Sequence, residues 1–69
     1  MTKEFEFFVY LIESYAQYKG KDSLSVMRTL DQKGLTEFVY RMYEMYHTEA
    51  IENAFYDIDS LISVGKPAW

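Results

Sequence analysis

Apolar residues recur every three or four positions through most of the chain, which is the period of an amphipathic helix. In the first stretch, Glu6, Glu13 and Gln17 fall on the side opposite the apolar residues, which are Phe5, Phe8, Val9, Leu11, Ile12, Tyr15 and Ala16. Glycines at positions 20, 34 and 65 punctuate the pattern, and nothing alternates with the period of a strand. We therefore expect a small all-α bundle of three to four helices with short connections, at about residues 3–18, 23–33, 36–46 and 48–64.

Polar residues that cap helices stand where these stretches begin. Asp22 or Ser23 is suited to cap the second helix, Thr36 the third and Thr48 the fourth. A cap at Thr48 implies that the chain bends at His47 and Thr48 instead of continuing as one long helix. A length of 69 residues predicts a single helical domain, residues 1–69.

Composition limits both the stability and the partners of such a domain. A chain of 69 residues can bury only a small apolar core, which gives limited stability. Its 19% aromatic content partly compensates, because each aromatic side chain buries a large area. Self-association or a protein partner is the remaining source of stability. There are no cysteines, which fits a cytoplasmic protein. Seven basic against eleven acidic residues give a net charge of −4, which disfavours nucleic acid. Glutamates within the first apolar run argue against a signal peptide or a membrane span.

The only histidine lies close in sequence to two aspartates, which raises the question of a catalytic pair. Asp57 follows Thr48 by nine residues, about 13 Å along a helix, so it is too far from His47 to share a proton. Asp57 and Asp59 point about 200° apart around the helix and form no carboxylate pair. We expect Asp57 at the core edge, accepting a tyrosine hydroxyl or capping amides, and Asp59 solvated or paired on the rim.

Glu44 and His47 spell Glu-x-x-His, half of the di-metal motif of four-helix bundles. Both residues fall on the face opposite the core stripe, whereas metal ligands must point inward, so we expect His47 to pack at a helix corner. The chain also lacks a cysteine nucleophile, a Gly-x-Ser-x-Gly turn and a glycine-rich phosphate loop. We expect no enzyme activity, no cofactor and no metal.

Residues 25–43 could instead form a helix-turn-helix, with two short helices joined at a glycine. The second of these helices begins Thr36, Glu37, Phe38, Val39 and Tyr40, and Arg41 is its only basic residue. A DNA-binding repressor therefore stays an alternative, and one that the net charge disfavours.

The number of tyrosines is larger than a core of this size can fully enclose. The chain has seven tyrosines, and a helical wheel places Tyr10, Tyr40, Tyr43 and Tyr56 on outer sides. Tyrosine is enriched at protein interfaces, although such rings also cover the rim of a core. Trp69 either folds back onto the domain or reaches into a partner. The candidate partner-binding residues are Tyr40, Tyr43, Glu44, His47 and Trp69.

Three features of the sequence are shared with a family of short bacterial proteins catalogued as a domain of unknown function. They are the opening "EFEFFVYLIESY", the Tyr-x-x-x-His-Thr step at Tyr43, His47 and Thr48, and the Asp-Ile-Asp of Asp57 to Asp59. The chain resembles this family along nearly its whole length, but has Tyr46 where leucine is expected and ends in "GKPAW". The resemblance implies an acidic helical protein that restrains an ADP-ribosyltransferase-like neighbour, as an antitoxin restrains a toxin.

The leading hypothesis is thus a non-enzymatic protein-interaction or regulatory module, antitoxin-like, whose face of Tyr40, Tyr43 and His47 contacts a protein encoded by a neighbouring gene. A self-associating structural domain, present as a homodimer, is the first alternative, and the helix-turn-helix repressor is the second.

Overall fold

The computed structural model describes all 69 residues, Met1–Trp69, and contains helices but no strand. The helices are α1 Lys3–Lys19, α2 Ser23–Gln32, α3 Thr36–Arg41, α4 Tyr43–Tyr46 and α5 Ile51–Val64. The prediction of a small all-α bundle is confirmed.

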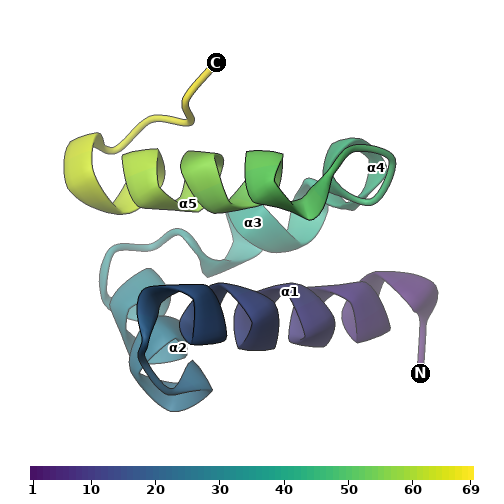
Figure 1. Cartoon of the computed structure of the whole chain (residues 1–69), viewed down its shortest axis with the longest axis horizontal. Helices are drawn as coiled ribbons and strands as arrows, with labels where there is room; N and C mark the ends of the chain where they lie inside the picture. The colour runs from purple at the N-terminus through teal and green to yellow at the C-terminus, as the bar shows by residue number, and fades with distance from the viewer.

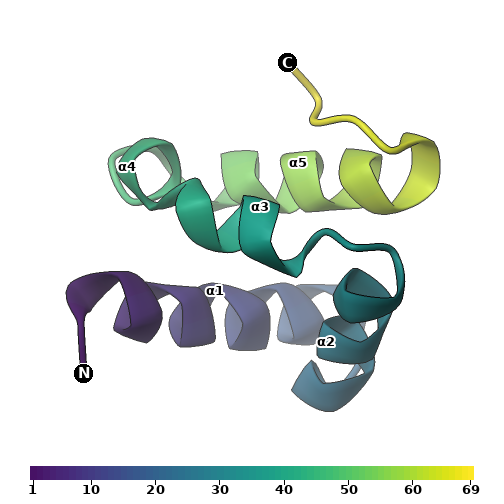
Figure 2. The ribbon, with the colours of Figure 1, turned by 180° about the vertical axis from the view of Figure 1, so that it is seen from behind.

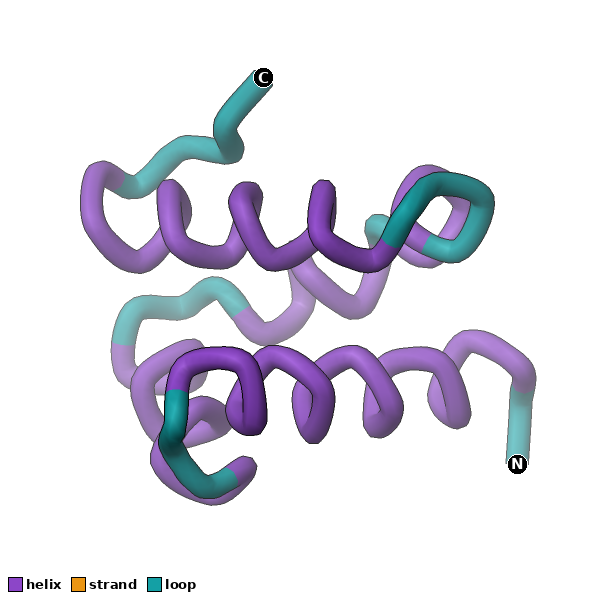
Figure 3. The backbone as a smooth tube through the Cα atoms, in the orientation of Figure 1, coloured by secondary structure: helices purple, strands orange, loops and turns teal.

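Helices α1 and α5 are the two long elements and run in the same direction, one above the other in Figure 1. Helix α3 lies between their levels, α2 packs at the end of α1, and α4 forms the corner that leads into α5, as the reverse view in Figure 2 also shows. After α5 the chain turns back and runs along the outer side of that helix (Figure 3). The long helices are therefore joined through short ones that occupy the middle and the ends of the bundle.

The first three helix boundaries follow the local signals in the sequence. The Thr2 hydroxyl accepts the amide of Phe5 at the start of α1, and Gly20 ends that helix with φ of 69°, a left-handed conformation that glycine adopts without strain. The Asp22 carboxylate accepts the amide of Ser25 at 2.8 Å and caps α2 as predicted.

The two predicted threonine caps are wrong. Thr36 is the first residue of α3, after an N-cap at Leu35, and its hydroxyl donates to the Asp31 carboxylate across the turn. Thr48 belongs to the end of α4, because its hydroxyl donates to the carbonyl oxygens of Glu44 at 3.2 Å and Met45 at 3.0 Å. The bend at residues 47 and 48 exists, but α5 begins only at Ile51.

The predicted helix at residues 36–46 is divided at Met42. The Met42 amide bonds to the carbonyl of Val39, three residues back, so the turn tightens and α4 starts in a new direction. Val39 before the division and Tyr46 after it both belong to the core, at 2% and 1% exposed.

The core is centred on the apolar stripe of α5. Phe55 packs its ring against Tyr15, with centroids 5.9 Å apart, and stacks on Tyr18 at 4.9 Å. The residues that are buried on α5 besides Asp57 are Ala54, Phe55, Ile58 and Leu61. Phe5 and Val9, predicted to point inward, remain over a third exposed because only α2 borders that side of α1. None of the helices is both long and apolar enough to cross a membrane.

The cap of α2 predicts a pH-dependent stability. Its hydrogen bonds, first of all the one from the Ser25 amide, lower the pKa of Asp22, so the stabilisation is present above the ordinary carboxyl pKa of about 4 and is lost as pH falls through the lower folded value. We expect Asp22→Ala to lower the urea midpoint at neutral pH, and the difference from the wild type to shrink in acid. Asp22→Asn, which keeps the cap but cannot ionise, is the control; a deficit of Asp22→Ala that stays constant with pH would contradict this explanation.

Candidate functional site

The residues expected to bind a partner lie around the corner formed by α4. The His47 ring stacks on Tyr43, with centroids 4.0 Å and planes 5° apart, and its Nδ1–H donates to the Tyr43 carbonyl oxygen. Phe7 of α1 meets Tyr43 edge-on at 5.7 Å, while Glu44 is exposed. His47 thus packs at a helix corner, as predicted, and its ring holds that corner to α1.

The prediction that Tyr40 and Tyr43 face outward is wrong. Both side chains are half-buried: Tyr40 packs against Phe8 with centroids 5.5 Å apart, and Tyr43 against Phe7. The helical wheel assumed a single helix over residues 36–46 with one side facing solvent, whereas α3 and α4 are two helices that both pack against α1. These tyrosines give their apolar area to the fold and little of it to a partner.

The histidine and the two aspartates do not form one site. The Nδ1 of His47 is bonded within its own turn, and each aspartate bonds a different segment of the chain. No group of three His, Cys, Asp or Glu residues lies close enough together to hold a metal ion. The geometry therefore gives the Glu-x-x-His pattern no inward-facing ligand set.

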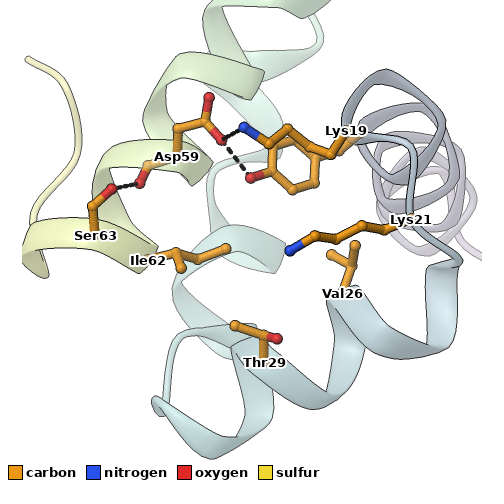
Figure 4. A pocket seen from close by; sticks show the side chains of 8 residues that line it. Lys19, Lys21, Val26, Thr29, Asp59, Ile62 and Ser63 are labelled. Carbon is orange, nitrogen blue, oxygen red and sulfur yellow. Dashed lines mark hydrogen bonds and ion pairs between the residues drawn. The ribbon is translucent and has the colours of Figure 1, made fainter.

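Asp59 joins α5 to the end of α1, as Figure 4 shows. Its Oδ1 accepts the hydroxyl of Tyr15 and lies 3.2 Å from the Nζ of Lys19. Burial, together with the hydrogen bond to Asp59, raises the pKa of Tyr15 above its ordinary value, so the phenol stays a donor. The aspartate pairs at the rim as predicted, but the tyrosine acceptor is Asp59, where we expected Asp57.

A cleft of about 430 Å³ opens beside this cluster, between α1, α2 and α5 (Figure 4). Its hydroxyls serve the fold: Ser63 donates to the Asp59 carbonyl and Thr29 to the Ser25 carbonyl at 3.1 Å. Lys19 is neutralised by Asp59, which leaves Lys21 as the unpaired charge on the wall. The polar groups of this cleft are therefore largely engaged with one another.

Asp57 binds the segment that follows α5. Its Oδ1 accepts the backbone N–H of Ala68 at 3.1 Å, and its Oδ2 accepts the indole Nε1–H of Trp69 at 2.8 Å. Gly65, with φ of 82°, turns the chain so that residues 66–69, hereafter the 66–69 segment, lie beside α5. Asp57 thus lies at the core edge and receives an amide as expected, and Trp69 folds back onto the domain.

Tyr46 is the one buried polar side chain left without a hydrogen bond. Its hydroxyl is inaccessible and has no partner at ordinary geometry. Burial, and then the charge of the nearby Asp57, raise the pKa of Tyr46 above its ordinary value, so it remains a neutral O–H. A desolvated hydroxyl without a partner costs free energy, and such groups call for a structural or functional reason.

The surface around Asp57 is a shallow hollow with apolar walls. It has a volume of about 250 Å³, and three elements supply its large side chains: Met45 from α4, Tyr56 from α5 and Trp69. Their exposed fractions are 36%, 54% and 68%, with Glu49 and Asn53 at the rim. We call this feature the Asp57 hollow; exposed apolar side chains inside a polar rim are typical of protein contact surfaces.

Sequence reasoning singled out Asp57, Tyr56 and Trp69 separately but did not bring them together. The signal was present in Gly65, because a left-handed turn after a helix returns the following residues along it.

The two buried tyrosines give opposite mutational predictions. We expect Tyr15→Phe to destabilise the fold by about 1–2 kcal/mol, because it removes a hydrogen bond to a charged carboxylate. Tyr46→Phe should be neutral or stabilising, because the hydroxyl that it removes is buried without a partner. Urea unfolding of both variants measures the difference; an equal loss in the two would show that Tyr46 is hydrogen-bonded in solution.

The same tyrosines predict a loss of stability in alkali. Their pKa values are raised in the folded state, so their contribution is full below the ordinary pKa of about 10 and is lost as pH rises through the folded values. Above about pH 10 we expect unfolding free energy to fall by up to about 1.4 kcal/mol per pH unit per tyrosine. Tyr15→Phe should flatten this slope, whereas the exposed Tyr56→Phe should leave it unchanged.

Comparison with known proteins gives one result. A family model described as "Protein of unknown function (DUF3791)" matches residues 6–63, which is most of the chain and ends before the 66–69 segment. No curated protein and no solved structure matches significantly. The region matched contains the α4 corner, Asp57 and Asp59, and the chain belongs to the DUF3791 family.

Proposed function

We propose that this chain is a non-enzymatic protein-interaction module whose partner docks on the Asp57 hollow. The observation that carries the proposal is the convergence of Met45, Tyr56 and Trp69, all substantially exposed, around a buried carboxylate. Aromatic anchors that surround a buried polar group resemble the centre of a binding hot spot.

The proposed docking surface is the Asp57 hollow, which differs from the face of Tyr40, Tyr43 and His47 that the sequence indicated. Tyr40 and Tyr43 are half-buried against α1, so truncating either would disturb the fold together with any interface. Glu44 and His47 are exposed on the α4 corner and would lie at the margin of a partner that covers Met45. Of the five candidates, Trp69 is the one that lines the Asp57 hollow.

The partner that we propose is an ADP-ribosyltransferase-like protein from a neighbouring gene, restrained in the manner of an antitoxin in the cytoplasm. The family resemblance supports this choice of partner, and the charge supports its chemistry. A chain of net charge −4 with Glu49 at the rim of the hollow favours a basic contact surface on the partner.

Self-association is the second candidate, favoured by a separate groove of about 280 Å³ between α1 and α2. Its walls are apolar apart from Glu13 and Ser23, and Leu24 stands nearby on α2, 59% exposed. A second copy that covered this groove would bury Phe5 and Val9, which the monomer leaves partly exposed.

DNA binding draws less support. The helix that would enter the major groove is α3, which has six residues, and its basic residue Arg41 is paired with Glu37 one turn away. A recognition helix needs free side chains for base edges.

The proposed function predicts that Tyr56→Ala weakens the complex with the neighbouring gene's product by about 30-fold, the loss of one hot spot of about 2 kcal/mol. Isothermal titration calorimetry of the purified proteins measures it. The matched control is Leu24→Ala, an exposed apolar residue on the other groove, which should leave affinity unchanged.

The reverse pattern, with Leu24→Ala harmful and Tyr56→Ala silent, would place the interface on the α1–α2 groove. A concentration-dependent dimer in light scattering, dissociated by Leu24→Ala and indifferent to the partner, would favour the self-associating domain.

A further inference from the structure

Asp57 is a buried carboxylate that no cation neutralises. Its exposed fraction is 5%, two neutral N–H groups, from Ala68 and Trp69, donate hydrogen bonds to it, and the neutral hydroxyl of Tyr46 lies nearby. A buried carboxylate is ordinarily paired with a positive charge or held by several donors. The ion pairs of the chain lie elsewhere, at Lys19–Asp59 and Glu37–Arg41.

The two donors are arranged like those of a guanidinium group. One N–H lies on each carboxylate oxygen, the Ala68 amide on Oδ1 at 3.1 Å and the Trp69 indole on Oδ2 at 2.8 Å. An arginine side chain presents two parallel N–H groups from one plane and adds a full positive charge, which shortens and strengthens both bonds. The 66–69 segment therefore donates one N–H to each carboxylate oxygen from neutral groups, whereas arginine would donate both from a single charged group.

The surroundings of Asp57 favour a cation. Glu49 lines the same hollow, and no lysine or arginine does. Tyr46, which is 1% exposed, places its hydroxyl near Asp57. This hydroxyl has no hydrogen-bond partner, and the 66–69 segment does not supply one. Tyr56 contributes an exposed ring, a surface on which a guanidinium stacks well.

The 66–69 segment is held lightly enough to be displaced. Trp69 remains 68% exposed, so its docking buries little apolar area, and the hydrogen bonds that tie the segment to the domain are the two to Asp57. The segment follows the turn at Gly65 and runs beside α5 without helical structure of its own (Figure 1). Segments with few buried contacts open at low free-energy cost.

We propose that Asp57 is a receptor for an arginine side chain of the protein partner, which displaces the 66–69 segment and pairs with both carboxylate oxygens. This inference rests on the proposed function and names the chemistry of its contact. Trp69 then holds the site closed in the free protein, and Met45 and Tyr56 remain at the rim of the open site as apolar contacts for the partner.

The test is a titration of the isotope-labelled full chain with a short capped peptide that contains one arginine, followed by nuclear magnetic resonance. The control peptide carries citrulline, which keeps the shape of arginine but is uncharged. Addition of the arginine peptide should move the Trp69 indole N–H and the Ala68 amide signals toward those of an unbound segment. The citrulline peptide should leave both signals in place.

Three variants identify the site. Asp57→Asn should abolish the response to arginine, whereas Glu52→Gln, a change of an exposed carboxylate on the first turn of α5, should keep it. Trp69→Phe should tighten peptide binding by up to about tenfold, because the competing segment has lost one hydrogen bond. This last variant retains Asp57, so it tests the site even where Asp57→Asn fails to fold.

The proposal is overturned if arginine and citrulline peptides act alike, or if neither moves the Trp69 signal. It is also overturned if the Trp69 signal changes with protein concentration and not with peptide, since that shows exchange of the segment between copies. A partner that binds wild type and Asp57→Asn equally, yet is weakened by Tyr56→Ala, would remove the arginine site and leave the interaction module standing.

Discussion

The apolar stripe of α5 has a carboxylate on each side, and the arrangement of the neighbouring segments depends on these two groups. Asp59 faces α1 and takes the Tyr15 hydroxyl and Lys19; Asp57 faces the other way and takes the 66–69 segment. Between them Ala54, Ile58 and Leu61 are buried in the centre of the bundle. Asp59 thus ties α5 to α1, whereas Asp57 ties the 66–69 segment back onto the helix that precedes it.

The middle of the chain, residues 36–46, forms two short helices. Once α1 and α5 are set, residues 36–46 must pass between them and still supply Val39 and Tyr46 to one small core. The Met42 amide bonds to the Val39 carbonyl three residues back, and after this division α4 forms a corner that leads into α5. The stack of His47 on Tyr43, with Phe7 against its edge, stabilises that corner from α1. The Tyr-x-x-x-His-Thr step thus encodes a turn of the fold.

The sequence predicted what depends on neighbours in the chain and missed what depends on neighbours in space. Helical class, the Gly20 stop and the Asp22 cap are local properties, and the structure confirms them. Thr36 and Thr48 carry the same local signal as Asp22, but the Thr36 hydroxyl donates to the Asp31 carboxylate and the Thr48 hydroxyl donates to the carbonyl oxygens of Glu44 and Met45. The helical wheel wrongly predicted that Tyr40 and Tyr43 face outward, because it assumes that one side of the helix faces solvent. Asp57 and Trp69 were noticed separately, since only the return of the chain at Gly65 makes them partners.

The two aspartates also differ in a way that bears on recognition. Asp59 has a cation and a phenol from the core helix α1, so its contacts are part of the folded state and a partner could replace them only by loosening the bundle. Asp57 is more deeply buried, yet its donors come from a segment that contributes little packing. Neutral donors satisfy that carboxylate well enough to keep the free protein stable, and a charged donor satisfies it better. A partner without a correctly placed cation gains nothing by displacing these two hydrogen bonds, so a surface that contacts only Met45 and Tyr56 would leave the 66–69 segment in place. In the proposed complex, specificity would come from the buried charge of Asp57, and affinity from the apolar side chains at the rim of the hollow.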